Sequence, residues 1–272
     1  MQNHPCVLTI AGSDSGGGAG IQADLKAMTV LGGFGTSVIT ALTAQNGLGV
    51  TGIHAPDADF VVQQLTTVLD GFPIAAAKTG MLFSAPIIMG VAGVLKDKQF
   101  PLVIDPVSIS TSGHALLQQD AVDALIEHIL PLADVVTPNK PEAEMLAGMK
   151  IESEEDVTTA IKRILELGPK AVLLKGGHFH DDEEELVDWL GCPDEAPVGL
   201  HHQRIATVNT HGTGCTLSAA IATYLAHGFD LKVAVKKAQV YLSLCLRESY
   251  TPGEGFGPPN HTAPWERQVV TR

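Results

Sequence analysis

The chain has 272 residues, of which 30 are acidic and 17 are Lys or Arg, so its formal net charge is −13. This negative charge excludes a protein that binds nucleic acid through a basic surface. A composition of 45% hydrophobic and 17% charged residues excludes an intrinsically disordered chain. We therefore expect a folded protein with a substantial core and no nucleic acid partner.

The sequence shows no targeting or membrane segment. It does not open with a basic stretch followed by a long apolar one, and no apolar run reaches the roughly 18 residues of a membrane span. These features predict a cytoplasmic protein without a membrane partner. Its cysteines have neither CxxC nor zinc-finger spacing, so we expect reduced thiols at Cys6, Cys192, Cys215 and Cys245.

Short β-branched runs alternate with longer amphipathic stretches, which is the pattern of an α/β fold. Strands are predicted at residues 6–11, 36–43, 75–78, 102–105, 134–137 and 171–175. Helices are predicted at residues 20–31, 58–69, 86–96, 121–130, 141–146, 154–167, 216–227 and 231–249. Several strands are apolar on successive residues, as expected of parallel strands covered on both faces.

Two segments interrupt this alternation. Residues 179–203 contain an acidic run and a Pro-rich stretch, and they predict an exposed antiparallel hairpin. Residues 251–272 are rich in Gly, Pro and Asn, and we expect them to be irregular. Because no internal repeat or linker divides the chain, we expect a single domain over residues 1–272.

The first candidate site is the glycine-rich loop of residues 12–20, GSDSGGGAG, between a strand and a helix. It is not a phosphate-binding Walker A loop, because no Lys-Ser/Thr pair follows, and Ile21 breaks the G-x-G-x-x-G register. The loop either approaches a ligand or forms a tight turn. Asp14 and Asp24 accordingly either bind a polar ligand or cap the turn.

The second candidate is the loop NTHGTGC, residues 209–215, at the start of a helical pattern. Gly212, Thr213 and Gly214 place backbone N–H groups at a helix N-terminus, which favours an anion. A plain glycine-rich helix start is the alternative interpretation.

Cys215 in this loop could be an inert thiol, a nucleophile or a general base. Its place in the first helical turn predicts a lowered thiol pKa. His211, four residues earlier, could serve as the imidazole partner of a cysteine hydrolase.

Polar residues also follow three of the predicted strands. Asp105, Thr137 and Glu142 could hold Mg²⁺ with phosphates outside the carboxyl ends of the sheet, or the carboxylates could only cap helices. Lys175 could pair with a phosphate or be a surface lysine. The stretch HFHDD at residues 178–182 imitates a metal site, but its spacing matches no strong ligand motif.

Six segments in order, AGSDSGGGAGIQADLKAM, TALTAQNG, KTGML, DVVTPNKPEAEML, LLKGGH and NTHGTGCTLSAAIA, closely resemble the hydroxymethylpyrimidine/phosphomethylpyrimidine kinases of thiamine biosynthesis. The resemblance covers most of the chain. It implies the ribokinase-like fold, a three-layer α/β/α domain with a central, mostly parallel sheet. It also implies a homodimer that transfers a phosphoryl group from ATP to the pyrimidine and then to its monophosphate.

The resemblance also implies roles for individual residues. It makes Gln45 the reader of the aminopyrimidine, with Gly12, Asp24, Met81 and Val107 around the ring. Cys215 falls where the wider superfamily commonly has Asp, so it resembles the general base beside the anion hole of Gly212 and Gly214.

The remaining implied residues handle the nucleotide. Lys175 resembles the phosphate lysine, and the nucleotide side would also include Asn139, Thr207 and Thr213. Asp105, Thr137 and Glu142 resemble the neighbourhood of Mg²⁺ and the phosphates.

One segment departs from the family pattern. Family members often read DPVMVAKSG where this chain has DPVSISTSG, with Ser108 and Thr111 in place of Met and Lys. This departure keeps pyridoxal, pyridoxine or pyridoxamine kinase activity as an alternative. A non-catalytic pyrimidine-binding protein is a second alternative, disfavoured because every phosphate-handling position is retained.

Overall fold

The computed structural model describes residues 4–107, 119–176 and 184–265. Its strands form one sheet in the order β3-β2-β1-β4-β5-β6-β7-β8-β9. Neighbouring strands from β2 to β7 are parallel, whereas β3, β8 and β9 are antiparallel to their neighbours. The strands are β1 (Cys6–Asp14), β2 (Phe34–Asn46), β3 (Gly49–His54), β4 (Ile74–Thr79), β5 (Leu102–Ile104), β6 (Val135–Val136), β7 (Val172–Leu174), β8 (Glu185–Gly191) and β9 (Val198–Gln203).

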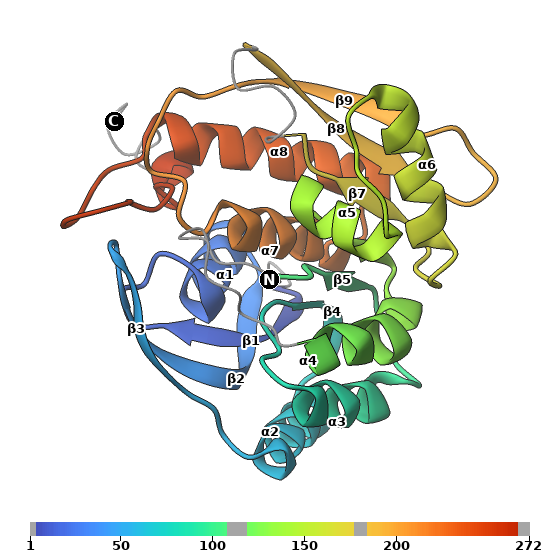
Figure 1. Cartoon of the computed structure of the whole chain (residues 1–272). Coiled ribbons are helices and arrows are strands. Elements are labelled where there is room, and N and C mark those ends of the chain that lie inside the picture. Colours follow the sequence, from blue (N-terminus) through green and yellow to red (C-terminus); the bar gives the residue numbers. More distant parts are fainter. Residues whose placement is uncertain (1–3, 108–118, 177–183, 266–272) are drawn as a thin grey trace.

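Helices cover both faces of this sheet (Figure 1). One face carries α1 (Gly20–Val30), α7 (Thr213–Ala226) and α8 (Leu231–Arg247), which pack side by side. The other face carries α2 (Ala58–Gly71), α3 (Ala85–Leu95), α4 (Gln119–Ala124), α5 (Lys140–Ala147) and α6 (Glu154–Leu165). The predicted three-layer α/β/α arrangement with a mostly parallel central sheet is therefore confirmed.

The successive apolar residues of the central strands fill two cores. In β5, Leu102 and Ile104 belong to the core under α2–α6, while Val103 between them belongs to the core under α1, α7 and α8. All three side chains are fully buried. Alternate residues of a strand point to opposite faces, so only a strand covered on both sides can be apolar throughout.

The predicted elements correspond to observed ones, with three differences. The hairpin of β8 and β9 is confirmed, but strand β3 was not predicted. The helix predicted at 121–130 is divided into α4, a π-helical turn at Leu125–Ile129 and a 3₁₀ turn at Leu130–Leu132. Helix α7 begins at Thr213, three residues earlier than predicted, so the predicted anion loop forms its first turn.

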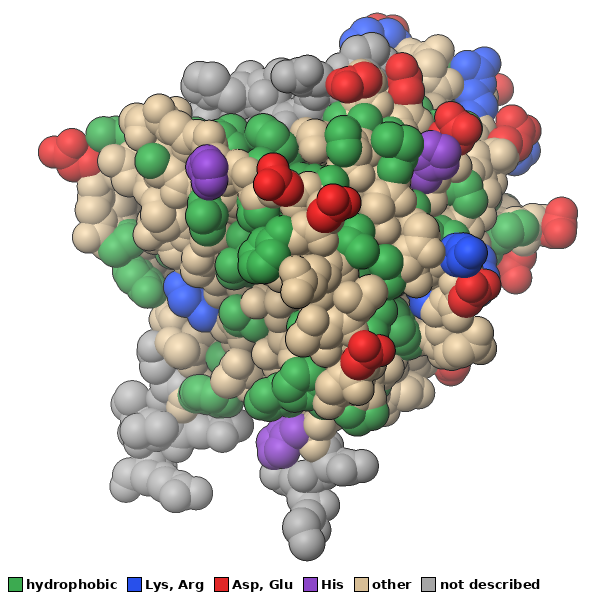
Figure 2. All heavy atoms as spheres, turned by 90° about the horizontal axis from the view of Figure 1, so that it is seen from below, with side chains coloured by type: hydrophobic (Ala, Val, Ile, Leu, Met, Phe, Trp, Pro, Cys, Tyr) green, Lys and Arg blue, Asp and Glu red, His purple; other side chains and the backbone are tan. Residues whose placement is uncertain are grey.

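The surface carries several exposed aromatic side chains. Phe34 and Phe72 stack with ring centroids 5.8 Å apart, and Phe60 on α2 is also exposed. The view from below Figure 1 shows hydrophobic side chains scattered over that face of the molecule, with acidic side chains between them (Figure 2). Within the described ranges, no helix has the length and apolarity needed to cross a bilayer.

Candidate active site

The two glycine-rich loops lie against each other, although about 200 residues separate them. Gly212, the N-cap of α7, has φ of +85°, and a Cβ at this position would overlap the carbonyl oxygen of Gly18. Only glycine allows both this backbone conformation and this close approach. The first turn of α7 therefore borders the loop that precedes α1.

Asp14 holds this junction together. Its carboxylate accepts hydrogen bonds from the backbone amides of Gly16, Gly18 and Ala19, and its Oδ2 lies 2.9 Å from His211 Nε2. Burial alone would raise the pKa of Asp14, but the hydrogen bonds from His211 and the amides hold it below its usual value. Asp14 thus caps the turn, and the partner of His211 is Asp14 rather than Cys215.

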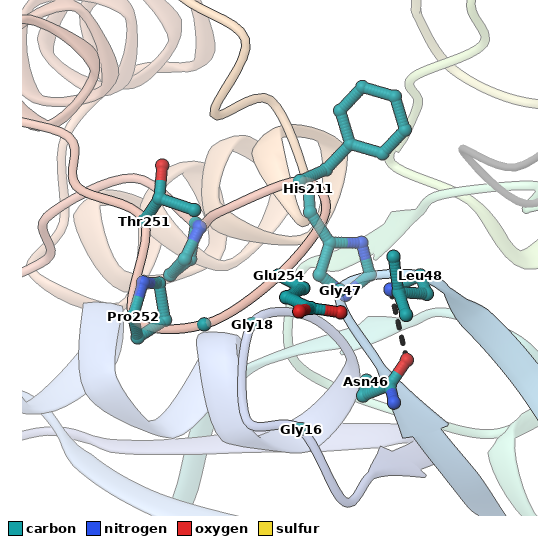
Figure 3. Close-up of a pocket in the computed structure, with 12 residues that line it drawn as sticks. Gly16, Gly18, Asn46, Gly47, Leu48, His211, Thr251, Pro252 and Glu254 are labelled. Carbon is teal, nitrogen blue, oxygen red and sulfur yellow. Dashed lines mark hydrogen bonds between the residues drawn. The ribbon is translucent and has the colours of Figure 1, made fainter.

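Gln45 lies beside this pair at the end of β2. Its Oε1 accepts a hydrogen bond from Thr43 at 3.0 Å, and its Nε2 is 3.3 Å from His211 Nε2. His211 also lines a pocket of about 280 Å³ between the loops at residues 16–18, 46–48 and 251–258. Figure 3 shows the imidazole between Glu254 and Leu48. Gln45 therefore contacts His211, which lines the pocket, but is not itself a lining residue.

Two of the residues assigned to the pyrimidine ring are in contact. A Cβ at Gly12 would clash with the Met81 Cε, so the absence of a side chain at Gly12 makes room for Met81. Val107, with φ of +30°, ends the described segment after β5.

Asp24 corrects the prediction. Its side chain is 0% exposed and pairs with the equally buried Lys78 at 3.2 Å, while Thr9 donates a 2.6 Å hydrogen bond to it. It therefore caps no turn, contrary to one of the two interpretations, whereas its assignment to the pyrimidine ring stays a prediction. A buried carboxylate needs a cation and hydrogen-bond donors, and these partners supply both.

Lys175 and Asp105 meet at the carboxyl ends of β7 and β5. Lys175 Nζ is 3.3 Å from Asp105 Oδ1, and the lysine side chain is only 16% exposed, so the surface interpretation is wrong. A Cβ at Gly214 would lie 3.3 Å from Asp105 Oδ2 and 3.5 Å from Lys175 Nζ. The ion pair therefore sits against the first turn of α7.

Burial alone would lower the pKa of Lys175, but the carboxylates of Asp105 and Glu142 raise it above its usual value. The ammonium is therefore fully charged at neutral pH. Glu142 and Asn139 form a reciprocal capping box at the start of α5, so Glu142 caps its helix as the alternative interpretation held. Thr137 is buried and its hydroxyl donates to Ile104 O at 3.4 Å.

Cys215 requires a second correction. Burial raises the pKa of its thiol to about 12, although the Lys78 ammonium and the Gly20 amide act in the opposite direction. The position in a first helical turn had predicted a lowered value. Loss of hydration outweighs the favourable helix end, because a thiolate away from water loses more solvation than the nearby dipoles return.

Three predictions remain, for Thr207, for Thr213 and for the segments at residues 108–111 and 178–182. Thr207 bonds to Ser249 and to the Asn209 amide, on a different loop from Asn139. Thr213 lies in the first turn of α7, where its amide donates to Thr210 O. Ser108, Thr111 and the HFHDD stretch at 178–182 lie outside the described residues.

Sequence analysis assigned no role to Lys78 or to Asp188. Both are charged residues inside otherwise apolar strand patterns, IAAAKT and ELVDWLG. A charged residue in such a pattern indicates a buried ion pair, because a charge that cannot reach water needs a partner of opposite sign. That signal was available in the sequence, but it does not identify the partner.

The phosphomethylpyrimidine kinase family model matches residues 14–260. A hydroxymethylpyrimidine/phosphomethylpyrimidine kinase of Haemophilus influenzae is 49% identical over 97% of this chain and 98% of its own. A thiamine biosynthesis bifunctional protein of Geobacter sulfurreducens is 48% identical over 94% of this chain, which spans only 52% of that relative.

Among solved structures, an ADP complex of Bacillus subtilis pyridoxal kinase has a TM-score of 0.87 and 36% identity, covering 97% of this chain and all of that one. This likeness confirms the ribokinase-like fold. The matched family model and the identity along nearly the whole chain lead to one conclusion: this chain belongs to the phosphomethylpyrimidine kinase family.

Proposed function

We propose that this protein is an ATP-dependent kinase that phosphorylates 4-amino-5-hydroxymethyl-2-methylpyrimidine and then its monophosphate, in thiamine diphosphate biosynthesis. One observation carries the proposal: the Lys175–Asp105 pair lies against the α7 N-terminus, whose loop in turn packs on the loop beside Gln45. A cation, backbone N–H donors and an amide for a heterocycle are thus within one region. Membership of the family supplies the reaction class.

The chemistry follows from these positions. Phosphoryl transfer is catalysed by positioning and by stabilising negative charge, and a lysine ammonium beside a helix N-terminus supplies both. Gly212 and Gly214 lie at the N-terminus of the same helix and would supply backbone N–H donors to the phosphate. Gln45 carries a donor and an acceptor, which an aminopyrimidine edge requires. The thiolate form of Cys215, a minor species at neutral pH, takes the proton of the hydroxymethyl group. We assign Asn139, Thr207 and Thr213 to the nucleotide side.

Mg²⁺ fits the residues that are present. Among the described residues, no three His, Cys, Asp or Glu side chains form a metal cage. The Asp105 carboxylate at the carboxyl end of β5 suits Mg²⁺, which is usually held by one or two carboxylates together with water and phosphates. Asp105, with Thr137 and Glu142 behind it, would hold the ion. When bound, Mg²⁺ neutralises phosphate charge during transfer.

A pyridoxal, pyridoxine or pyridoxamine kinase is the second candidate, because the Bacillus subtilis relative of the same fold is named a pyridoxal kinase. Ser108 and Thr111 are the residues at which the sequence departs from the family pattern. The higher identity to the Haemophilus influenzae relative favours the pyrimidine.

An assay with ATP, Mg²⁺ and a panel of acceptors tests the proposal. We expect turnover of hydroxymethylpyrimidine and of its monophosphate with kcat/KM well above that of each pyridoxine vitamer. A preference for a vitamer would instead establish the second candidate. Binding of the pyrimidine without turnover of any acceptor would establish a non-catalytic pyrimidine-binding protein.

We also propose a cytoplasmic homodimer. The exposed side chains of Phe34, Phe60 and Phe72 and the edge strand β3 support self-association, because exposed aromatics and strand edges favour pairing. Sedimentation equilibrium should give twice the chain mass of 28.5 kDa. A monomer throughout the micromolar range would contradict this.

A further inference from the structure

A buried carboxylate holds the residue that follows Lys175. Asp188 on β8 accepts a 2.7 Å hydrogen bond from the Gly176 amide through its Oδ1. On the other side, the Lys175 amide donates to the carbonyl oxygen of Pro138 at 2.9 Å. The backbone of Lys175 is therefore fixed by one bond to the β6–α5 loop and by one bond to a side chain of β8.

The backbone of Gly176 packs tightly against β8. A Cβ at Gly176 would overlap the carbonyl of Val187, so the Gly176 backbone lies directly on β8 next to Asp188. No side chain larger than hydrogen fits there without moving one of the two strands. The strand end that carries Lys175 thus has little freedom while β8 keeps its position.

Asp188 is itself held from two other elements. Gln239 on α8 donates a 2.7 Å hydrogen bond to Oδ2, and His202 Nε2 on β9 makes a 3.2 Å ion-pair contact with the same oxygen. Burial alone would raise the pKa of Asp188, but His202, Gly176 and Gln239 lower it. The carboxylate is therefore ionised at neutral pH and is held by two hydrogen bonds and one close contact with histidine.

We propose that Asp188 is a positioning residue for phosphoryl transfer, which fixes the Lys175–Gly176 backbone so that the Lys175 ammonium stays beside Asp105 and the first turn of α7. The inference rests on the proposed role of Lys175. A catalytic group displaced by about 1 Å can lose on the order of a hundredfold in rate. Without Asp188, the Gly176 amide loses its acceptor, and the strand end can move to find another.

Asp134 provides a matched control. It too accepts a hydrogen bond from a strand amide, that of Leu102 at 2.8 Å, and it pairs with Lys98 and Lys170. It lies at the amino end of β5, whereas Lys175 lies at the carboxyl edge of the sheet. A carboxylate that only stabilises the sheet should behave like Asp134.

The experiment is a double-mutant cycle of Asp188→Ala and Lys175→Ala, with kcat measured per folded enzyme and melting temperature measured in parallel. We expect Asp188→Ala to lower kcat by about tenfold to a hundredfold with the KM for the pyrimidine nearly unchanged. In the Lys175→Ala background it should change kcat by less than about twofold, since residues acting as one unit are not additive. Asp188→Asn, which retains an acceptor for Gly176, should recover most of the rate.

Three outcomes would overturn the proposal. Full additivity in the cycle would show that Asp188 does not act through Lys175. An equal loss of kcat in Asp134→Ala would show a general effect of stability. Wild-type kcat in Lys175→Ala would remove the role of Lys175 itself, and the positioning role with it. Should Asp188→Ala not fold, Asp188→Ser takes its place in the same cycle, because its hydroxyl is too short to replace the carboxylate.

Discussion

The protein contains two lysine–aspartate pairs with nearly equal separations and different surroundings. Lys78–Asp24 has a separation of 3.2 Å and both side chains are 0% exposed. Lys175–Asp105 has a separation of 3.3 Å, but the lysine retains 16% exposure and faces the start of α7. The first pair is closed within the core, whereas the second can exchange a partner for a ligand. Exposure, rather than distance, separates a structural pair from a candidate catalytic one.

The largest effect is expected at the closed pair. Lys78→Met leaves Asp24 buried without its cation, and breaking a buried pair in this way destabilises a protein by about 3 to 5 kcal/mol. Urea unfolding at pH 7 measures this loss. Adding Asp24→Asn should restore part of the free energy of unfolding, because it removes the uncompensated charge. A loss below 1 kcal/mol would mean that this pair behaves like an exposed one.

The open pair should respond in the opposite way. Lys175→Ala removes charge stabilisation at the transferred phosphoryl group, and loss of one such group typically lowers kcat by about 10² to 10³. The free energy of unfolding should change much less than in Lys78→Met. Steady-state kinetics and unfolding of the same preparation test both statements. Unfolding of the variant, or full retention of its activity, would make Lys175 structural or superficial.

The charges of both pairs act on the Cys215 thiol, since Lys78, Asp24 and Asp105 all influence its pKa. With a pKa of about 12, the thiolate fraction rises tenfold per pH unit through the neutral range. A general base with this property should make phosphorylation of hydroxymethylpyrimidine accelerate by up to about tenfold per unit from pH 7 to 9. The monophosphate, whose second pKa is near 6, is already ionised and should show no such rise.

Single-turnover rates with both acceptors, on wild type and Cys215→Ala, check this prediction. In Cys215→Ala the two pH profiles should no longer differ, because no thiolate is left to accept the proton. Phosphorylation of the monophosphate should be affected least, because the glycine amides of the α7 N-terminus remain. Equal losses for both acceptors would assign Cys215 to the shape of the anion site. A trapped phosphocysteine would identify a covalent nucleophile.

The smallest effect is expected at Gln45, which touches neither pair. Gln45→Leu leaves the polar edge of the bound pyrimidine unpaired, which should weaken its binding by roughly 1 to 3 kcal/mol. The KM for ATP should stay almost unchanged. Isothermal titration with the pyrimidine and with a non-hydrolysable ATP analogue measures both. Unchanged affinity for the pyrimidine would remove the role of Gln45.

Most of the fold could be predicted from local patterns. The apolar runs of β1, β4, β5 and β7 appear where the sequence predicts them, and α6 begins at its predicted residue, behind a capping box of Ser153 and Asp156. Strand β3 was missed because GVTGIH contains two glycines and has no buried residue, so no alternation indicates a strand. Its pairing with β2 depends on the neighbouring strand, which local propensity does not include.

By itself, the sequence determined the alternation of strands and helices, and with it the placement of Asp105 and Lys175 at strand ends. Only the tertiary structure decided which carboxylate is open and which is closed, since the partners are 54 residues apart in Lys78–Asp24 and 70 apart in Lys175–Asp105. It also reversed the expected shift at Cys215. Burial depends on every element packed around a group, so the same residue types acquire different charges and roles at different depths.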